Sequence, residues 1–130
     1  MTSDIIDFLY ARYDEDEQVA QKALGLSPRR WHLSGSSIVA RTESGSETVV
    51  APTIWPQEGE HIVRHDPARV LTDLNAKRRV VDVLRGFEPN NEWDTQPDMG
   101  LRANNAAGAL RALALAYAGH PDYHSDWRPR

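Results

Sequence analysis

The dipeptide Asp66-Pro67 is the feature that most constrains how this chain of 130 residues can fold. Aspartate is one of the best helix N-caps, and proline suits the first helical position because its missing N–H is not needed there. Apolar residues follow at helical spacing from Val70 to Leu84, and Gly86 suits the left-handed conformation that ends many helices. The sequence therefore predicts an amphipathic helix over 67–85.

Three further helices are predicted. Residues 4–24 carry apolar side chains at helical spacing between Ser3, a suitable cap, and Gly25, a suitable end. Pro56 begins a short helix that runs to about His65, and an alanine-rich helix is expected over 103–118. The acidic run 14–17 interrupts the apolar stripe of the first helix, which is typical of a solvated face.

Between residues 29 and 52 the spacing of apolar residues changes to the alternation that is typical of strands. Apolar side chains are set two apart in this stretch, and the glycines of two Ser-Gly-Ser turns, Gly35 and Gly45, separate the apolar runs. Glycine supplies the positive φ that tight hairpins need. An antiparallel meander of three short strands follows from this pattern.

These elements predict an α+β domain, a small three-stranded antiparallel sheet covered by three main helices, 4–24, 67–85 and 103–118. The length favours one domain over 1–130. Residues 88–102 are rich in Pro, Asn and Asp, which predicts a surface loop and the best candidate for disorder. The end of the chain, 119–130, is predicted to lie across the core as a strap.

Composition excludes several classes of function. The chain has no cysteine, so disulfides, thiolate metal ligands and a cysteine nucleophile are absent. A net charge of −4 disfavours nucleic acid and anionic membrane as partners. No apolar run has membrane-spanning length, and the acidic N-terminal stretch does not match a secretory signal, so a cytoplasmic location is expected.

Two H-x-x-x-H pairs, His61/His65 and His120/His124, are the pattern in which metal chemistry could lie. On a helix His61 and His65 would share one face, and Asp66 and His120 could complete a set of ligands for a water-activating ion. The alternative is architectural, with His65 packing at the Asp66-Pro67 junction and His120 ending the last helix. The architectural interpretation is favoured, because five histidines produce such spacings by chance and no H-E-x-x-H motif occurs. No cofactor is predicted.

Binding surfaces are indicated by basic and aromatic residues. The predicted 67–85 helix carries the only substantial basic cluster, in which Lys77, Arg78 and Arg79 are consecutive. Because no groove-reading motif accompanies them, a solvated face that pairs with the acidic first helix is favoured over phosphate binding. Trp93 and Trp127, with the acidic run 14–17, are candidate contacts for a protein partner, and the alternative for each tryptophan is burial.

Three stretches together resemble a family of small actinobacterial and actinophage proteins classed only as a domain of unknown function. They are ARYDEDEQVA at 11–20, HIVRHDPARVL with AKRRVVDVL across 61–84, and LALAYAGHPDYHSDWRP at 113–129. The resemblance implies a bacterial or phage cytoplasm and an accessory role, and it carries no catalytic residue. Similar members often have cysteine where this chain has Asn104-Asn105-Ala106, which weakens the metal hypothesis further.

The leading hypothesis is a non-catalytic binding or regulatory protein that acts through protein–protein contacts, with an unknown protein partner and self-association through amphipathic helices as a further expectation. A small metal-dependent hydrolase or nuclease that uses the His/Asp residues stays open as an alternative. A nucleic-acid binder that uses Lys77, Arg78 and Arg79 is the third hypothesis.

Overall fold

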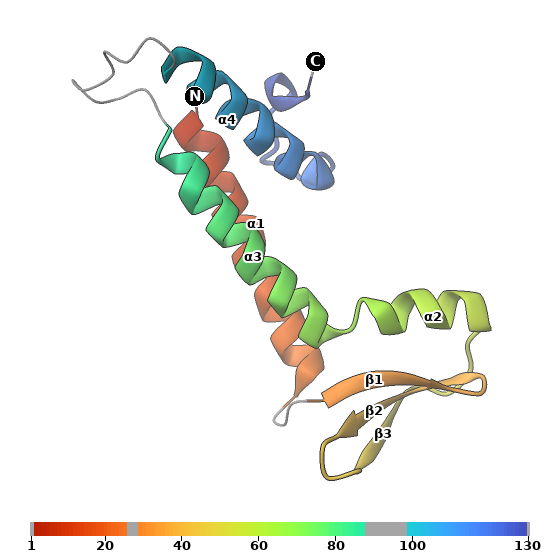
Figure 1. Cartoon of the computed structure of the whole chain (residues 1–130). Helices are drawn as coiled ribbons and strands as arrows, with labels where there is room; N and C mark the ends of the chain where they lie inside the picture. The colour runs from red at the N-terminus through yellow and green to blue at the C-terminus, as the bar shows by residue number, and fades with distance from the viewer. Residues whose placement is uncertain (1, 26–28, 88–98, 130) are drawn as a thin grey trace. The chain divides into compact units, whose positions relative to one another are not determined.

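The computed structural model describes residues 2–25, 29–87 and 99–129, with the side chains of 2, 3 and 99–101 left aside. Its elements follow one another as shown in Figure 1. They are α1 (Thr2–Leu24), β1 (Arg29–Ser34), β2 (Ser37–Thr42), β3 (Glu47–Ala51), α2 (Pro56–Arg64), α3 (Pro67–Arg85), α4 (Met99–Ala114) and two 3₁₀ turns, Leu115–Tyr117 and Ser125–Trp127. The predicted α+β class with one three-stranded antiparallel sheet is confirmed.

The chain divides into two compact units. Unit 1 consists of Met1–Glu15 and Ala76–Arg130, and unit 2 consists of Asp16–Asn75. Helices α1 and α3 each contribute one part to each unit. The prediction of a single domain stays a prediction.

The sheet of unit 2 is the predicted meander, with strand order β1-β2-β3 and antiparallel pairing throughout. The two hairpins turn at Gly35 and Gly45, which have φ of 60° and 90° and so confirm the expected need for glycine. The pairing of β2 with β3 shifts between Ile38 and Val39, where Val50 is the extra residue on β3. The central strand supplies the buried part of the sheet, Ile38 to Ala40.

Helix α2, to which the sequence analysis assigned no packing role, contacts β1 and β2. The close approach occurs at Gly59, which is buried. A Cβ atom placed there would lie 2.7 Å from Cδ1 of Leu33 and 3.2 Å from Cγ2 of Ile54. The missing side chain therefore lets the helix backbone lie directly against the sheet and the segment that follows it.

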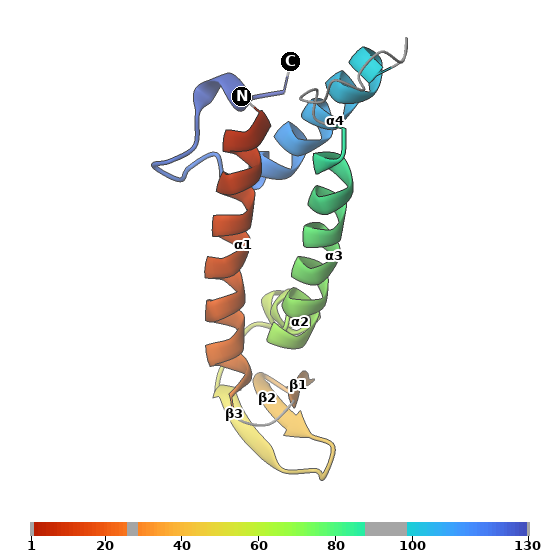
Figure 2. The ribbon, with the colours of Figure 1, turned by 90° about the vertical axis from the view of Figure 1, so that its left-hand side faces the viewer.

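Unit 1 has a helical core. Figures 1 and 2 show the first part of α1 beside the last part of α3 and beside α4. Tyr13, Leu9 and Ile6 of α1 are fully buried, as the predicted stripe requires. The other buried apolar residues of this unit are Ile5, Phe8, Val81, Ala106, Leu110, Ala114 and Trp127.

Polar contacts join α1 to α3 within unit 1. Arg78 donates to the Asp14 carboxylate at 2.9 Å, which is the predicted pairing of the basic helix with the acidic run. The Tyr10 hydroxyl donates to Asp82 one turn of α3 further on. Burial and the neighbouring Asp82 carboxylate raise the pKa of Tyr10 above its usual value. The hydroxyl therefore stays protonated and keeps its role as a donor at neutral pH.

Two predicted boundaries need correction. The loop expected over 88–102 cannot extend to 102, because α4 already begins at Met99; residues 88–98 lie outside the described part of the chain. Met, Leu and Arg are good helix formers, and they outweigh the single glycine at position 100. The helix expected over 103–118 ends at Ala114 and continues as a 3₁₀ turn to Tyr117.

Candidate functional site

His61 of α2 and His65, the C-cap residue just after it, lie together, as their spacing predicted. Their ring centroids are 4.6 Å apart. Nδ1 of His65 donates to the carbonyl oxygen of His61 at 2.8 Å, which leaves Nε2 as the nitrogen able to bind an ion. Geometry therefore provides two neighbouring, exposed imidazoles at the C-terminal end of α2.

Asp66, the neighbouring carboxylate, is engaged elsewhere. Its side chain is fully buried and accepts hydrogen bonds from Nε of Arg30 at 2.7 Å, the amide of Trp31 at 3.2 Å and the amide of Arg69 at 3.0 Å. The Arg69 bond is the predicted N-cap of α3. Burial raises the pKa of Asp66, but the Arg69 amide, Arg30 and the Trp31 amide together outweigh burial and hold the pKa below its usual value. Asp66 is thus a buried, charged side chain that links β1 to α3 by hydrogen bonds.

His120 belongs to unit 1, where it contacts the guanidinium of Arg12. Its Nδ1 also accepts the amide of Asp122 at 3.0 Å. Across residues 2–25, 29–87 and 99–129, no three or more His, Cys, Asp or Glu side chains are grouped so as to hold a metal ion. The metal site and the hydrolase that would use it remain untested predictions.

The C-terminal strap packs on α1 through Arg12 and Phe8. Arg12 is buried, its Cζ lies 5.1 Å from the centre of the Phe8 ring, and its Nη2 lies 3.1 Å from Glu15. Phe8 also meets the rings of Tyr117, His120, Tyr123 and Trp127, with centroids between 5.1 and 6.2 Å apart. The segment HPDYHSDWRP, singled out from the sequence, therefore closes the core of unit 1.

The predicted binding residues have different environments. Trp127 is only 7% exposed, which agrees with the burial alternative, and Trp93 lies outside the described residues. Lys77 and Arg79 are exposed on α3, whereas Arg78 is partly buried against Asp14. The basic helix is therefore partly neutralised, and its use for phosphate binding remains a prediction.

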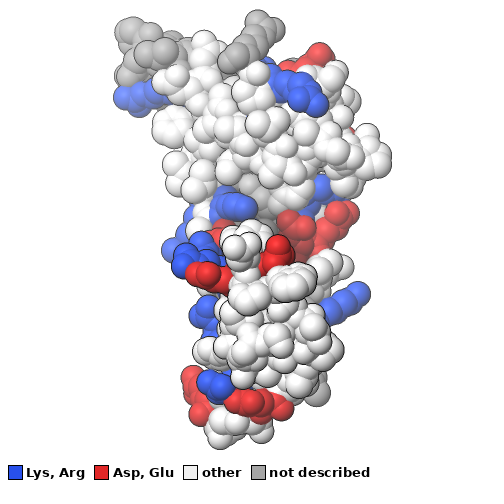
Figure 3. Space-filling view, turned by 90° about the vertical axis from the view of Figure 1, so that its right-hand side faces the viewer, with Lys and Arg blue, Asp and Glu red and all other residues white. Residues whose placement is uncertain are grey.

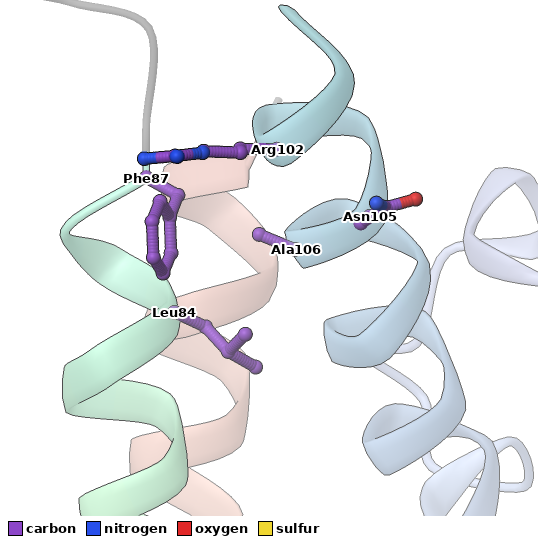
Figure 4. Close-up of a pocket in the computed structure, with 5 residues that line it drawn as sticks. All are labelled: Leu84, Phe87, Arg102, Asn105 and Ala106. Atoms are coloured by element: carbon purple, nitrogen blue, oxygen red, sulfur yellow. The ribbon is translucent and has the colours of Figure 1, made fainter. Parts of the chain in front are cut away.

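A hollow of about 290 Å³ lies in unit 1 where α3 ends and α4 begins. Leu84, Phe87 and Ala106 give it apolar walls, and Arg102 and Asn105 are its polar lining residues. Figure 4 shows the Leu84 and Ala106 side chains directed into the space between the helices, with Arg102 extending across it towards Phe87. Its volume is at the lower limit for a small-molecule site.

Sequence reasoning missed Trp55, the residue just before α2. Its side chain is 79% exposed, the largest exposed fraction among the large apolar residues named for the described chain. Leu33, Val49 and Val50 of the same unit are 37%, 60% and 40% exposed. Figure 3 shows the end of unit 2 where β1 turns into β2, with few charged atoms except along its margins. Trp55 lies between β3 and α2, outside the periodic patterns of strands and helices, so the sequence offered no signal for its exposure.

No helix in the described part of the chain has both the length and the apolar character needed to cross a membrane.

The comparisons with known proteins add a family and little else. The chain is 29% identical over 120 residues to "Clathrin heavy chain 1" of Arabidopsis thaliana, a stretch that covers 91% of this chain and 7% of the plant protein. The chain thus spans a small fraction of the length of that curated relative. No solved structure matches the chain. A family model described as "Family of unknown function (DUF6221)" matches residues 2–129, and the chain therefore belongs to that family.

Proposed function

We propose that this protein is a non-catalytic binding or regulatory protein that acts through contact with another protein, and that Trp55 is the anchor of the contact. The observation that carries the proposal is the exposure of an indole, 79%, at the start of helix α2. Tryptophan is among the side chains most enriched at interface hot spots.

The backbone at Trp55 is held by contacts within the protein itself. Trp55 is extended, with φ of −66° and ψ of 140°, and Pro56 follows at the first position of α2. The carbonyl of Trp55 accepts the amide of Gly59 at 2.9 Å, and Gly59 is packed against Leu33. Presenting the indole on a rigid base lowers the entropy lost on binding, which favours a role as an anchor.

The surroundings of Trp55 suggest the chemistry of the partner. Trp55, Pro56, Gln57 and Glu58 line a hollow of about 540 Å³. Glu58 is the only charged residue among them, and the whole chain has a net charge of −4. A partner with an apolar pocket of indole size and Lys or Arg on its rim would complement this surface in both shape and charge.

The setting of this activity is part of the proposal. The resemblance of residues 11–20, 61–71 with 76–84, and 113–129 to small actinobacterial and actinophage proteins supports a bacterial or phage cytoplasm and an accessory role. An accessory protein needs a specific contact surface and no catalytic group, which is consistent with the exposed Trp55 and with the structural role of Asp66.

The test is quantitative binding by matched variants. The tagged protein, Trp55→Ala and Val83→Ala are used to capture proteins from cells that express the chain natively; Val83 is a comparable control because it is 63% exposed but lies in unit 1. We expect one protein to be retained by the wild type and Val83→Ala and lost with Trp55→Ala. Purified, that protein should bind Trp55→Ala at least about tenfold more weakly. Equal affinity for all three variants would contradict the proposal.

A further inference from the structure

We propose that β3 is a self-association edge, at which β3 of a second copy pairs antiparallel about a two-fold axis at Val49. This inference goes beyond the proposed function, since it concerns a different element, Glu47–Ala51, and a second copy of the same chain. The two surfaces can be tested separately, because Trp55 lies outside β3.

The first step is that β3 has an open side. The strand order β1-β2-β3 places it at one edge of the sheet, as Figure 1 shows, with β2 on its inner side. Among the described residues no strand pairs with its outer side. An edge strand presents a row of unpaired N–H and C=O groups that fits another extended chain.

The second step is that β3 carries no uncompensated charge that would repel another strand. Residues 47–51 contain no lysine, arginine or proline. The one charge, Glu47, is neutralised by Arg41 on β2, which donates from Nε and Nη2 at 2.9 and 2.6 Å. Edge strands that must stay single usually carry uncompensated charge or proline, so nothing in this strand repels a second copy.

The opposite edge differs in this respect. β1 begins with Arg29 and Arg30, and the amide of Trp31 is already bound by the Asp66 carboxylate at 3.2 Å. Helix α2 also contacts β1. The charge of Arg29, an occupied backbone donor and a packed helix protect β1, whereas the features that protect β3 are its short length and its bulge. β3 is therefore the more open edge of the sheet.

The third step is that the strand is complementary to itself. Antiparallel pairing centred on Val49 places Thr48 opposite Val50 and Glu47 opposite Ala51 of the second copy, so no like charges meet. Val49 and Val50 are 60% and 40% exposed, and the pairing would bury part of this apolar surface away from water. Both backbone pairing and apolar burial therefore favour a second copy at this edge.

The paired stretch is short, because the bulge at Val50 and the proline at position 52 limit it to five residues. Such a contact buries less area than a standard stable dimer, so we expect a dissociation constant of about 100 μM. The association would become significant where the protein is concentrated on a shared partner.

The test is sedimentation equilibrium of the whole chain from about 5 μM to about 1 mM, with charges placed on the two-fold axis. Val49→Lys and Val49→Glu should each remain monomeric, because like charges would face each other across the axis. An equal mixture of the two should recover a dimer. Val83→Lys is the matched control on an exposed valine of α3 and should dimerise as the wild type does.

Melting curves matched to the wild type will show that the Val49 variants fold, as expected for an exposed position. A wild type that stays monomeric to about 1 mM, a Val49→Lys variant that still dimerises, or a mixture without recovery would each overturn the inference. Trp55→Ala should dimerise normally and Val49→Lys should keep its protein partner, so failure of this inference is separable from failure of the proposed function.

Discussion

The carboxylate of Asp66 accepts the main-chain amide of Trp31 at 3.2 Å, across 35 positions of sequence. The same buried side chain caps α3 through the amide of Arg69. One residue thus fixes the outer edge of β1 and the first turn of α3. Loss of its charge would release both contacts at once.

Asp66→Ala is expected to lower the free energy of unfolding at pH 7 by about 3 kcal/mol, because it removes three charge-assisted hydrogen bonds at a buried site. Urea denaturation measures the loss. Asp73→Ala is the control: its carboxylate, 55% exposed, lies 3.9 Å from Arg69, and such surface pairs contribute little.

The decrease in the free energy of unfolding caused by Asp66→Ala should depend on pH. Because the folded pKa of Asp66 lies below its usual value, its stabilisation is complete above the unfolded pKa of about 3.9 and disappears as pH falls through the folded pKa. The difference in the free energy of unfolding between the wild type and Asp66→Ala should therefore become smaller below about pH 4. A difference that stays constant down to about pH 2 would contradict a stabilising charge at this position.

Replacing glycine by alanine at two positions should change the free energy of unfolding in opposite directions. Gly45→Ala meets no neighbouring atom within 4 Å, but its φ of 90° is strained for alanine, so we expect a loss of about 1–2 kcal/mol. Gly108→Ala also meets nothing and lies inside α4, where alanine should stabilise by about 0.5–1 kcal/mol. Thermal melts of both variants check the pair; a stabilising Gly45→Ala would show that the hairpin turn is wrongly described.

Trp127→Ala should destabilise unit 1 by about 3–4 kcal/mol, because the indole is buried and its ring centre lies 5.1 Å from that of Phe8. Chemical denaturation followed by circular dichroism measures the change. Asp126→Ala, an exposed neighbour, should cost less than about 0.5 kcal/mol. Equal effects of the two variants would refute the role of the strap in the core.

Zinc should not stabilise the folded protein through His61 and His65. The two imidazoles lack a third ligand among the described residues, and Asp66 is already bound to Arg30. Addition of about 100 μM zinc should therefore raise the melting temperature of the wild type no more than that of His65→Ala. Zinc that co-purifies in stoichiometric amount and is lost in His65→Ala would contradict this expectation and support the hydrolase hypothesis.

The sequence predicted the secondary structure better than the surface. Hairpin glycines and the Asp66 cap act over a few residues, so Gly35, Gly45 and Asp66 could be placed from local chemistry. The second role of Asp66, its bond to Trp31, depends on two distant segments meeting, which no local pattern encodes. For the same reason the exposure of Trp55 and the burial of Trp127 could not be distinguished beforehand.

The central claim, that Trp55 anchors a protein contact, is tested most directly by photo-crosslinking in the cells that express the chain. A benzophenone amino acid placed at position 55 should give one crosslinked band containing a second, different protein, while the same group at position 83, in place of an exposed valine, should give none. Identical crosslinking patterns from the two positions, or none from either, would contradict the account.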